Sequence, residues 1–390
     1  MKTFKTYLCW LPGKYIGGAE KYGLDLSFQF AKESYKVYIL CPYAECYSKV
    51  NELISNEFAN SGLHVAAVYC KAPSESKLYK LPLIRKLHLI YWVHRYHSII
   101  KDLGPHAIHI ILPFPSRSFS FIHSAIKFHI PVTITFQLVP PSLRINRRYL
   151  RLFRSIVDKV KFISVSDNNR DNLTKLLSVN PDHIHTIPNR PKPIRDKISQ
   201  SERVQLLCEL GLDTTHFICT TVAALVPRKG YEDVIRACRF VVDQDPSYRF
   251  LFIGTGPHEA TLRLLVEELE LTDNIFFLGH RTDVHHLLQL SQAFVFPSMS
   301  EGLSFALMEA VQYNVPLIAS TQCGADEFLI PTLHFKIYEN GDIPTLSHHL
   351  LSTRKNYHDA TKTATLAAQA LQEYSYNDMI TDTSAIIFRS

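Results

Sequence analysis

Apolar residues occur along much of the chain in short continuous runs, separated by segments with helical periodicity. In the second half these runs occupy residues 216–225, 249–254, 274–279, 293–297 and 316–320. Between them, segments such as 231–243 and 258–270 repeat apolar positions every three or four residues, as amphipathic helices do. Since strands without alternation are buried on both faces, the pattern predicts a parallel sheet covered by helices.

The first half repeats this pattern less regularly. Its apolar runs occupy residues 6–11, 36–41, 64–70, 107–113, 132–136 and 161–166. We therefore predict two α/β doubly wound, Rossmann-like domains, 1–195 and 196–375, joined near the polar stretch 188–203. Residues 376–390 are expected to form a C-terminal helix that packs back on the N-terminal domain. Ligands bind at the carboxyl ends of parallel strands, so chemistry is expected in a cleft between the two domains.

Length and composition agree with this organisation. A chain of 390 residues exceeds what one hydrophobic core usually supports. No apolar run approaches about 18 residues, the length that a membrane-spanning helix needs. The N-terminus lacks the apolar core of a signal peptide, and the eight cysteines show no paired spacing. We therefore expect a cytoplasmic protein.

The net charge of +6 is distributed unevenly. Residues 1–200 carry a net charge of +16 and residues 201–390 a net charge of −10. Segments 77–101 and 143–162 mix basic with aromatic and aliphatic residues at helical spacing. Such helices suit an anionic membrane surface, but a helix with a buried stripe and solvated arginines would give the same pattern. No nucleic-acid-binding motif is visible, so nucleic acid is not an expected partner.

The stretch SEGLSFALMEA, residues 300–310, places one carboxylate before a predicted helix and another inside it. The helix is expected to begin near Ser304. N–H groups of a first helical turn have no acceptor within the helix, and the helix dipole is positive there, so an anion fits at this end. Glu301 and Glu309 would then accept hydrogen bonds from hydroxyl groups. Alternatively, Glu301 only caps the helix and Glu309 is solvated.

Seven segments, in a consistent order, carry a resemblance to a known family. They are GGAEKYGLDLSFQFAK (17–32), ISVSDNNRDNL (163–173), IHTIPN (184–189), ALVPRKGYEDVIRA (224–237), FLFIGTGPHEATLRLLVEEL (250–269), NIFFLG (274–279) and AFVFPSMSEGLSFALMEAVQYNVPLIASTQCGADEF (293–328). Together they resemble the retaining glycosyltransferases of the GT-B fold, glycosyltransferase family 4, also called the group 1 glycosyltransferases. The resemblance spans residue 17 to about residue 330, which is most of the chain.

The resemblance implies roles for four acidic or basic side chains. Glu309 would bind the ribose hydroxyls of a nucleotide-sugar donor, and Glu301 would hold hydroxyls of the transferred sugar. Lys229 would neutralise the donor diphosphate, together with the start of the helix. Glu327 matches the last position of the donor loop.

Backbone groups would complete the donor site. The resemblance implies that the N–H groups of Leu303, Ser304 and Phe305 bind the diphosphate. It also implies that Gly17 and Gly18 let the backbone of the other domain approach the same diphosphate, because glycine has no side chain in the way.

Three departures from the family pattern bear on these roles. An arginine usually precedes the lysine by five residues, but here that position is Ala224, and Arg228 is the candidate replacement cation. A histidine often follows the strand at 132–136, where this chain has Phe136 and then Gln137. Gln137 is a candidate catalytic residue together with Glu301 and Lys229; it can hydrogen-bond but cannot carry a proton near neutral pH. The usual PNG turn is PNRP, so Arg190 is expected to point into the cleft.

We therefore predict a hexosyltransferase-type glycosyltransferase (EC 2.4). It would move a sugar from a nucleoside-diphosphate-sugar to a glycan or lipid-linked acceptor, with retention of configuration, in polysaccharide or glycolipid biosynthesis. It would work in the cytoplasm, with the inner face of the membrane as a candidate surface. No x-D-x-D element and no set of metal ligands occurs, so we expect no cofactor and no obligatory metal. The alternatives are a catalytically weak sugar-nucleotide-binding partner subunit and a sugar-nucleotide epimerase.

Overall fold

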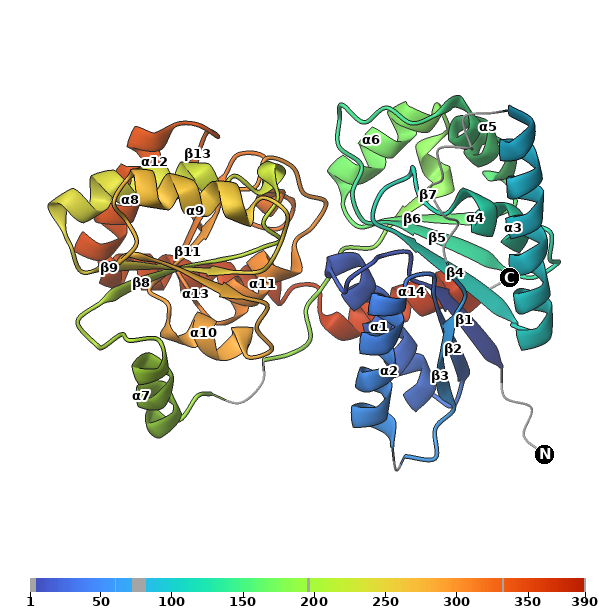
Figure 1. The fold of residues 1–390 in the computed structure, drawn as a ribbon, viewed down its shortest axis with the longest axis horizontal. Helices are drawn as coiled ribbons and strands as arrows, with labels where there is room; N and C mark the ends of the chain where they lie inside the picture. Colours follow the sequence, from blue (N-terminus) through green and yellow to red (C-terminus); the bar gives the residue numbers. More distant parts are fainter. Residues whose placement is uncertain (1–4, 60, 72–81, 195–196, 332, 389–390) are drawn as a thin grey trace. The chain divides into compact units, whose positions relative to one another are not determined.

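The chain forms two compact units in the computed structural model, which describes residues 5–59, 61–71, 82–194, 197–331 and 333–388 (Figure 1). The N-terminal unit comprises Met1–Asn189 and Asn377–Ser390, and the C-terminal unit comprises Arg190–Tyr376. The chain therefore passes between the units twice. The first passage lies six residues before the predicted boundary between residues 195 and 196.

The N-terminal unit is built on a seven-stranded parallel sheet with the strand order β3-β2-β1-β4-β5-β6-β7. Its strands are β1 (Thr6–Trp10), β2 (Lys36–Cys41), β3 (Val65–Tyr69), β4 (Ala107–Leu112), β5 (Val132–Phe136), β6 (Lys161–Ser164) and β7 (Ile184–Thr186). Its helices are α1 (Gly18–Lys32), α2 (Ala44–Phe58), α3 (Pro82–Leu103), α4 (Phe119–Ala125), α5 (Arg147–Ile156), α6 (Asp167–Leu177), the 3₁₀ turn η2 (Pro181–His183) and α14 (Tyr376–Phe388). The strand order reverses between β1 and β4, which makes their loops a topological switch point.

The C-terminal unit has a six-stranded parallel sheet with the order β10-β9-β8-β11-β12-β13. Its strands are β8 (Phe217–Val222), β9 (Tyr248–Ile253), β10 (Ile275–Gly279), β11 (Ala293–Phe296), β12 (Leu317–Ser320) and β13 (Lys336–Tyr338). Its helices are α7 (Gln200–Glu209), η3 (Pro227–Lys229), α8 (Tyr231–Gln244), α9 (Glu259–Glu268), α10 (Val284–Leu290), α11 (Phe305–Gln312), η4 (Ala325–Glu327), α12 (Ile343–Lys355) and α13 (Tyr357–Leu371). Here the order reverses between β8 and β11.

Two doubly wound parallel sheets confirm the predicted fold class. The continuous apolar runs became strands, including the edge strands β3 and β10, whereas β7 and β13 were not predicted. The C-terminal helix α14 packs on the N-terminal unit, where the ring of Phe388 stacks on Tyr35 and contacts Tyr7 and Phe30. The tail thus packs the aromatic ring of Phe388 on a unit that otherwise ends at Asn189.

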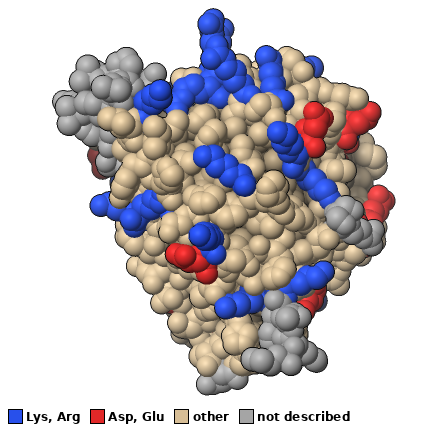
Figure 2. Space-filling view, turned by 90° about the vertical axis from the view of Figure 1, so that its right-hand side faces the viewer, with Lys and Arg blue, Asp and Glu red and all other residues tan. Residues whose placement is uncertain are grey.

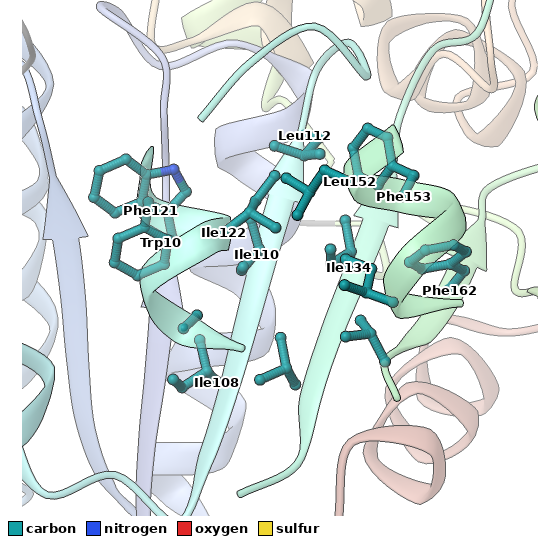
Figure 3. Packing of buried hydrophobic residues seen from close by; sticks show 14 of the residues in the cluster. Trp10, Ile108, Ile110, Leu112, Phe121, Ile122, Ile134, Leu152, Phe153 and Phe162 are labelled. Carbon is teal, nitrogen blue, oxygen red and sulfur yellow. The ribbon is translucent and has the colours of Figure 1, made fainter. Parts of the chain in front are cut away.

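The core of the N-terminal unit explains one departure from the family pattern. Phe136, at the end of β5, is fully buried and packs edge-to-face on Phe153 and Phe162, with ring centroids 5.5 Å away in both cases. Figure 3 shows Phe153 and Phe162 among the residues of this core. Phe136 is therefore a packing residue that faces away from the sheet edge. Gln137, the next residue, is therefore the one that replaces the histidine often found in the family.

Candidate functional site

Lys229 and Glu301 lie on the loops that follow the two central strands of the C-terminal sheet. Strands β8 and β11 are hydrogen-bonded neighbours and run parallel, so the loops that leave them emerge at the same carboxyl edge. The strand order reverses between this pair, so each loop turns to the opposite face of the sheet and leaves room at the edge. The topology thus brings together two residues that are 72 positions apart in the sequence.

A single carboxylate oxygen is the centre of this cluster. Oε1 of Glu301 accepts hydrogen bonds from Nζ of Lys229 and Oγ of Ser298, and Nη1 of Arg228 lies 3.4 Å from it. The Lys229 and Glu301 side chains are each only 10% exposed, and that of Arg228 is 39% exposed. Arg228 also donates to the carbonyl of Ser300 at 3.0 Å. Side chains of consecutive residues usually diverge, but here both cations reach the same acid.

The electrostatics of the cluster favour a charged Glu301. Burial raises the pKa of its carboxyl, but the positive charges of Lys229 and Arg228 more than compensate, so the pKa lies below its ordinary value. The site therefore holds two cations and one anion close together. A diphosphate that binds to the cations would have to compete with Glu301 for them.

Gly230 allows this arrangement because no other residue fits its position. Its φ is +65°, in the left-handed region, and a Cβ atom there would lie 2.2 Å from the carbonyl oxygen of Pro297. The tight approach is fixed further by the N–H of Met299, which donates to the carbonyl of Arg228 at 2.9 Å. Lys229 is thereby held against the loop that carries Glu301.

Helix α11 begins where the sequence predicted. Ser304 is its N-cap, with extended backbone (φ −80°, ψ 123°), and its side chain makes no capping hydrogen bond. The side chains of Leu303 and Phe305 are buried, which fixes the first turn, and Glu309 is half-buried on the same helix. Glu301 is not the cap residue of this helix, so its proposed alternative role as a helix cap is wrong.

The loop that carries Glu327 packs beside the Glu301 loop. Gly324 has a φ of +74°, and a Cβ atom on it would lie 3.0 Å from the carbonyl oxygen of Gly302. The 3₁₀ turn η4 follows at once and ends at the half-buried Glu327. The structure therefore gathers Lys229, Arg228, Glu301, the start of α11 and the Glu327 loop at one edge of the C-terminal sheet.

In the N-terminal unit, Gly17 is held by a residue that sequence reasoning missed. The carboxylate of Glu20 accepts the N–H of Gly17 at 3.1 Å, and Gly17 is the N-cap of α1, in which Gly18 is the first residue. Glu20 is 4% exposed, and burial raises the pKa of its carboxyl. The spacing G-x-x-E is that of a capping box, which would have identified this contact. Gly17 has a φ of −110°, which any residue adopts.

Gln137 lies at the carboxyl end of β5 and is 8% exposed. Its side-chain oxygen accepts a hydrogen bond of 2.9 Å from the amide of Asn189, and its backbone N–H donates to Leu112. Its side-chain nitrogen is buried and makes no hydrogen bond within the described residues, so Gln137 could donate to a substrate while its oxygen stays bound to Asn189.

Arg190 is buried, and the contacts that the structure shows for it lie within the C-terminal unit. It is 6% exposed, its Nε donates to the carbonyl of Tyr374 at 2.7 Å, and its guanidinium lies over the rings of Tyr374 and Phe328. The side chain also contacts the sulfur of Met308. Arg190 therefore fixes the start of the C-terminal unit to its end.

Models of two glycosyltransferase families match the chain in the order of its two units. The model of glycosyltransferase family 4 matches residues 16–189, and that of the glycosyl transferases group 1 matches residues 207–369. Together the two models span both units and identify the chain as a glycosyltransferase. These matches confirm the predicted enzyme class, glycosyltransferase (EC 2.4), and agree with the family motifs, while retention of configuration stays a prediction.

Two curated relatives of this glycosyltransferase match parts of the chain. It is 32% identical over 152 residues to a GDP-mannose-dependent monoacylated alpha-(1-6)-phosphatidylinositol monomannoside mannosyltransferase of Corynebacterium glutamicum, a match to 37% of this chain and 39% of the relative. It is 26% identical over 187 residues to the UDP-Gal:alpha-D-GlcNAc-diphosphoundecaprenol alpha-1,3-galactosyltransferase of Escherichia coli. This match covers 46% of this chain and 47% of the relative. The matched segment thus spans less than half the length of each of these curated relatives.

Solved structures extend the similarity of fold to the whole chain. The crystal structure of Anabaena HepE in complex with UDP and glucose superimposes with a TM-score of 0.78, over 97% of this chain and 98% of HepE, at 16% sequence identity. At that identity the likeness concerns the fold, and the predicted roles of individual residues in this glycosyltransferase stay predictions.

The described residues form neither a metal centre nor a membrane-spanning helix. Among them, no group of three or more His, Cys, Asp and Glu side chains is arranged to hold a metal ion. In the same part of the chain, no helix is both long enough and apolar enough to cross a bilayer.

The basic helix α5 buries its apolar stripe, Leu152, Phe153 and Ile156, in the core. Its apolar face is therefore not available to a membrane.

Proposed function

We propose that this protein transfers a hexose from a nucleoside-diphosphate-sugar to a glycan or lipid-linked acceptor, with retention of configuration, in polysaccharide or glycolipid biosynthesis. The observation that carries the proposal is the convergence of Lys229 and Arg228 on Glu301 beside the start of α11. A cation pair, a helix N-terminus and a hydroxyl acceptor are the groups that a sugar diphosphate requires.

The reaction would rest on stabilisation of the leaving group. As the bond between the sugar and the diphosphate breaks, negative charge grows on the diphosphate, and Lys229, Arg228 and the first turn of α11 would stabilise it. The diphosphate would take the cations from Glu301, whose carboxylate would then accept hydroxyls of the sugar. Glu309 would bind the ribose. With Lys229 and Arg228 supplying positive charge, we propose that turnover needs no divalent metal and survives chelation by EDTA.

Both the donor and the acceptor classes have support among the relatives. The names of the two relatives above specify GDP-mannose and UDP-galactose as donors, and a phosphatidylinositol glycolipid and a diphosphoundecaprenol-linked sugar as acceptors. The HepE structure contains UDP. A donor panel should therefore include both guanosine and uridine diphosphate sugars.

Thermal-shift measurement against such a panel tests the donor site. We expect one or a few nucleotide sugars to stabilise the wild type, and Glu309→Ala to lose the ribose-dependent part of the shift. The matched control is Glu267→Ala, an exposed glutamate of α9 that should keep the full shift. An undiminished shift in Glu309→Ala would remove the donor-site assignment.

A catalytically weak partner subunit is the second candidate function. It is favoured by Ala224 in place of a cation and by Gln137, which is already hydrogen-bonded to Asn189. Donor binding without sugar transfer or donor hydrolysis, across a broad acceptor panel, would support it. Isomerised donor without any acceptor would instead identify an epimerase on the same fold.

We further propose that the protein works on the cytoplasmic face of an anionic membrane. Residues 76–157 contain 13 Lys and Arg but a single acid, Asp102. Figure 2 shows a face of the N-terminal unit on which Lys and Arg are prominent and acids are few. Each such cation contributes on the order of 1 kcal/mol to binding at an anionic surface. Co-sedimentation with anionic vesicles at low and high salt tests this, and binding that ignores salt would reject it.

A further inference from the structure

Ser298 is a third hydrogen-bond donor to the carboxylate of Glu301. It lies two residues after the end of β11, is fully buried, and donates from its hydroxyl to Oε1, the oxygen that both cations also face. The other acceptor within its reach, the carbonyl of Arg228, is 3.5 Å away, so the carboxylate is the better acceptor. Unlike Lys229 and Arg228, this donor is neutral and belongs to the same loop as its acceptor.

The backbone of Ser298 is fixed by the neighbouring strand. Oγ of Ser320, the last residue of β12, donates to the carbonyl of Ser298 at 2.5 Å, and Ser320 is also fully buried. Because β12 pairs with β11, this hydrogen bond ties the start of the Glu301 loop to the sheet. The position of the Ser298 hydroxyl therefore does not depend on Lys229 or Arg228.

A bound diphosphate would affect the three donors differently. Lys229 and Arg228 would direct part of their charge and hydrogen bonding to this anion, so the positive field on Glu301 would weaken. The carboxylate would stay buried, and burial favours its protonated form. Since charge-assisted hydrogen bonds are the stronger ones, a protonated Glu301 would hold sugar hydroxyls less firmly. Ser298 is neutral and fixed, so a diphosphate would not draw its hydroxyl away.

The neighbouring titratable groups cannot take the place of the cations. The loop after β12 brings the thiol of Cys323 and the carboxylate of Asp326 to this side of the site. Burial and, to a smaller extent, the charges of Asp326 and Glu301 raise the pKa of Cys323 to about 12, so its thiol carries no charge near neutral pH. A negative Asp326 opposes the ionisation of Glu301. In the part of the chain that the structure describes, Ser298 is thus the uncharged side-chain donor on Oε1.

We propose that Ser298 is a positioning residue that keeps Glu301 oriented and ionised while a diphosphate occupies Lys229 and Arg228. Its hydroxyl stays on Oε1 and leaves the other oxygen, Oε2, for hydroxyls of the sugar. The inference rests on the proposed transferase function and concerns the donor-bound state of that site. It predicts that loss of this hydroxyl matters little in the free protein, where the two cations compensate, and much more in the complex.

Proton uptake on nucleotide binding tests this without any need for turnover. Calorimetric titrations with UDP and with GDP, in buffers of different ionisation enthalpy, give the number of protons taken up. At about pH 6, Ser298→Ala should take up more protons than the wild type, because Glu301 stays charged in the free variant and protonates in its complex. Protons exchanged by the nucleotide itself are common to the proteins compared, so the difference reports on the site.

Ser291→Ala is the matched control. Ser291 is 7% exposed and precedes β11, at the opposite end of the strand, and its hydroxyl donates to the carbonyl of Leu287 at 2.7 Å. The variant loses a buried hydroxyl from the same region of the sheet but leaves Glu301 untouched. It should bind nucleotide with the proton uptake of the wild type.

Kinetics supply a second measurement that a purely structural role would not move. The pH dependence of kcat reports on the substrate complex and that of kcat/KM on the free enzyme. In Ser298→Ala, the acidic limb of kcat should move upward by about one pH unit, as expected for a lost hydrogen bond to a charged group. The acidic limb of kcat/KM should move less, because the cations still face Glu301 in the free enzyme.

The outcomes separate this proposal from the proposed function. Equal proton uptake by Ser298→Ala and the wild type would overturn the role of Ser298 alone, and so would equal displacement of the two acidic limbs. Increased uptake in Ser291→Ala as well would overturn it in favour of a general loosening of the sheet. Failure of the wild type to bind either nucleotide would instead remove the donor site, and the role of Ser298 with it.

Discussion

Lys229 and Glu301 form an ion pair across the two central loops of the C-terminal unit, with both side chains only 10% exposed. Removal of two charges from water is costly, and the attraction between them recovers the cost only when the geometry is good. Such a pair is therefore a weak source of stability but a strong constraint on position. In this site it holds the cation at the carboxyl edge, where the proposed diphosphate would bind, and keeps Glu301 charged.

Single substitutions of the pair should destabilise more than the double substitution. Glu301→Gln leaves the largely buried charge of Lys229 without its partner, at a cost of roughly 3 kcal/mol, and Lys229→Met leaves Glu301 with only the more exposed Arg228, whereas the double variant leaves neither buried charge. Urea unfolding of the three variants and the wild type gives the coupling free energy by a double-mutant cycle. Additive effects of the two substitutions would show that the pair does not form in solution.

The same pair predicts the direction of a pH dependence. The pKa of Glu301 lies below its ordinary value of 4.5, so the unfolded chain takes up this proton at a higher pH than the folded protein. The contribution of the pair is thus complete above that ordinary value and is lost as pH falls through the lowered native pKa. The difference in unfolding free energy between wild type and Glu301→Gln should shrink from neutral pH to about pH 3. A difference that grows as the pH falls would contradict the assignment.

Gly230 should be irreplaceable for a steric reason. In Gly230→Ala, the new methyl group meets the Pro297 carbonyl in addition to the left-handed backbone strain, and we expect a loss of roughly 4 kcal/mol together with loss of donor binding. Gly211→Ala is the matched control: its φ is +66°, but nothing lies within 4 Å of the added Cβ, so only about 1–2 kcal/mol of strain is expected. Chemical unfolding measures both, and equal losses would show that the Pro297 contact is unimportant.

Substitution of Gly17 by alanine should affect donor binding, whereas substitution of Gly13 by alanine should affect stability. A Cβ atom at Gly17 would lie 3.4 Å from Glu20, which the fold tolerates, whereas at Gly13 it would lie 2.2 Å from the same carboxylate. We expect Gly17→Ala to fold with wild-type stability but to raise the KM for the donor about tenfold, which corresponds to ~1.4 kcal/mol. Gly13→Ala should displace Glu20 and lose about 1 kcal/mol of stability with the cap of α1. An unchanged KM in Gly17→Ala would remove Gly17 from the donor site.

Much of the fold could be predicted from the sequence because the central strands are continuous apolar runs. β7 and β13 were missed because each is an edge strand of three residues with polar positions, IHT and KIY, too short for a periodic signal. The family motifs pointed to Lys229 and Glu301, but their contact depends on β8 lying beside β11, which no local pattern states. Arg228 reaches the same carboxylate because of the turn at Gly230. From the sequence alone, the side chains of the consecutive residues Arg228 and Lys229 are expected to diverge.

The contacts of Arg190 could not be predicted from the sequence. Its partners, Met308, Phe328 and Tyr374, lie more than a hundred residues away in sequence, so an arginine in a loop looked like a ligand contact. Its planar guanidinium stacks on rings while Nε donates to a carbonyl, and a lysine cannot do both. Arg190→Lys should therefore destabilise the C-terminal unit by about 1–3 kcal/mol while the KM for the donor stays at the wild-type value. Thermal unfolding and donor titration of the same preparation distinguish this from a binding role, in which stability would hold and the KM would rise.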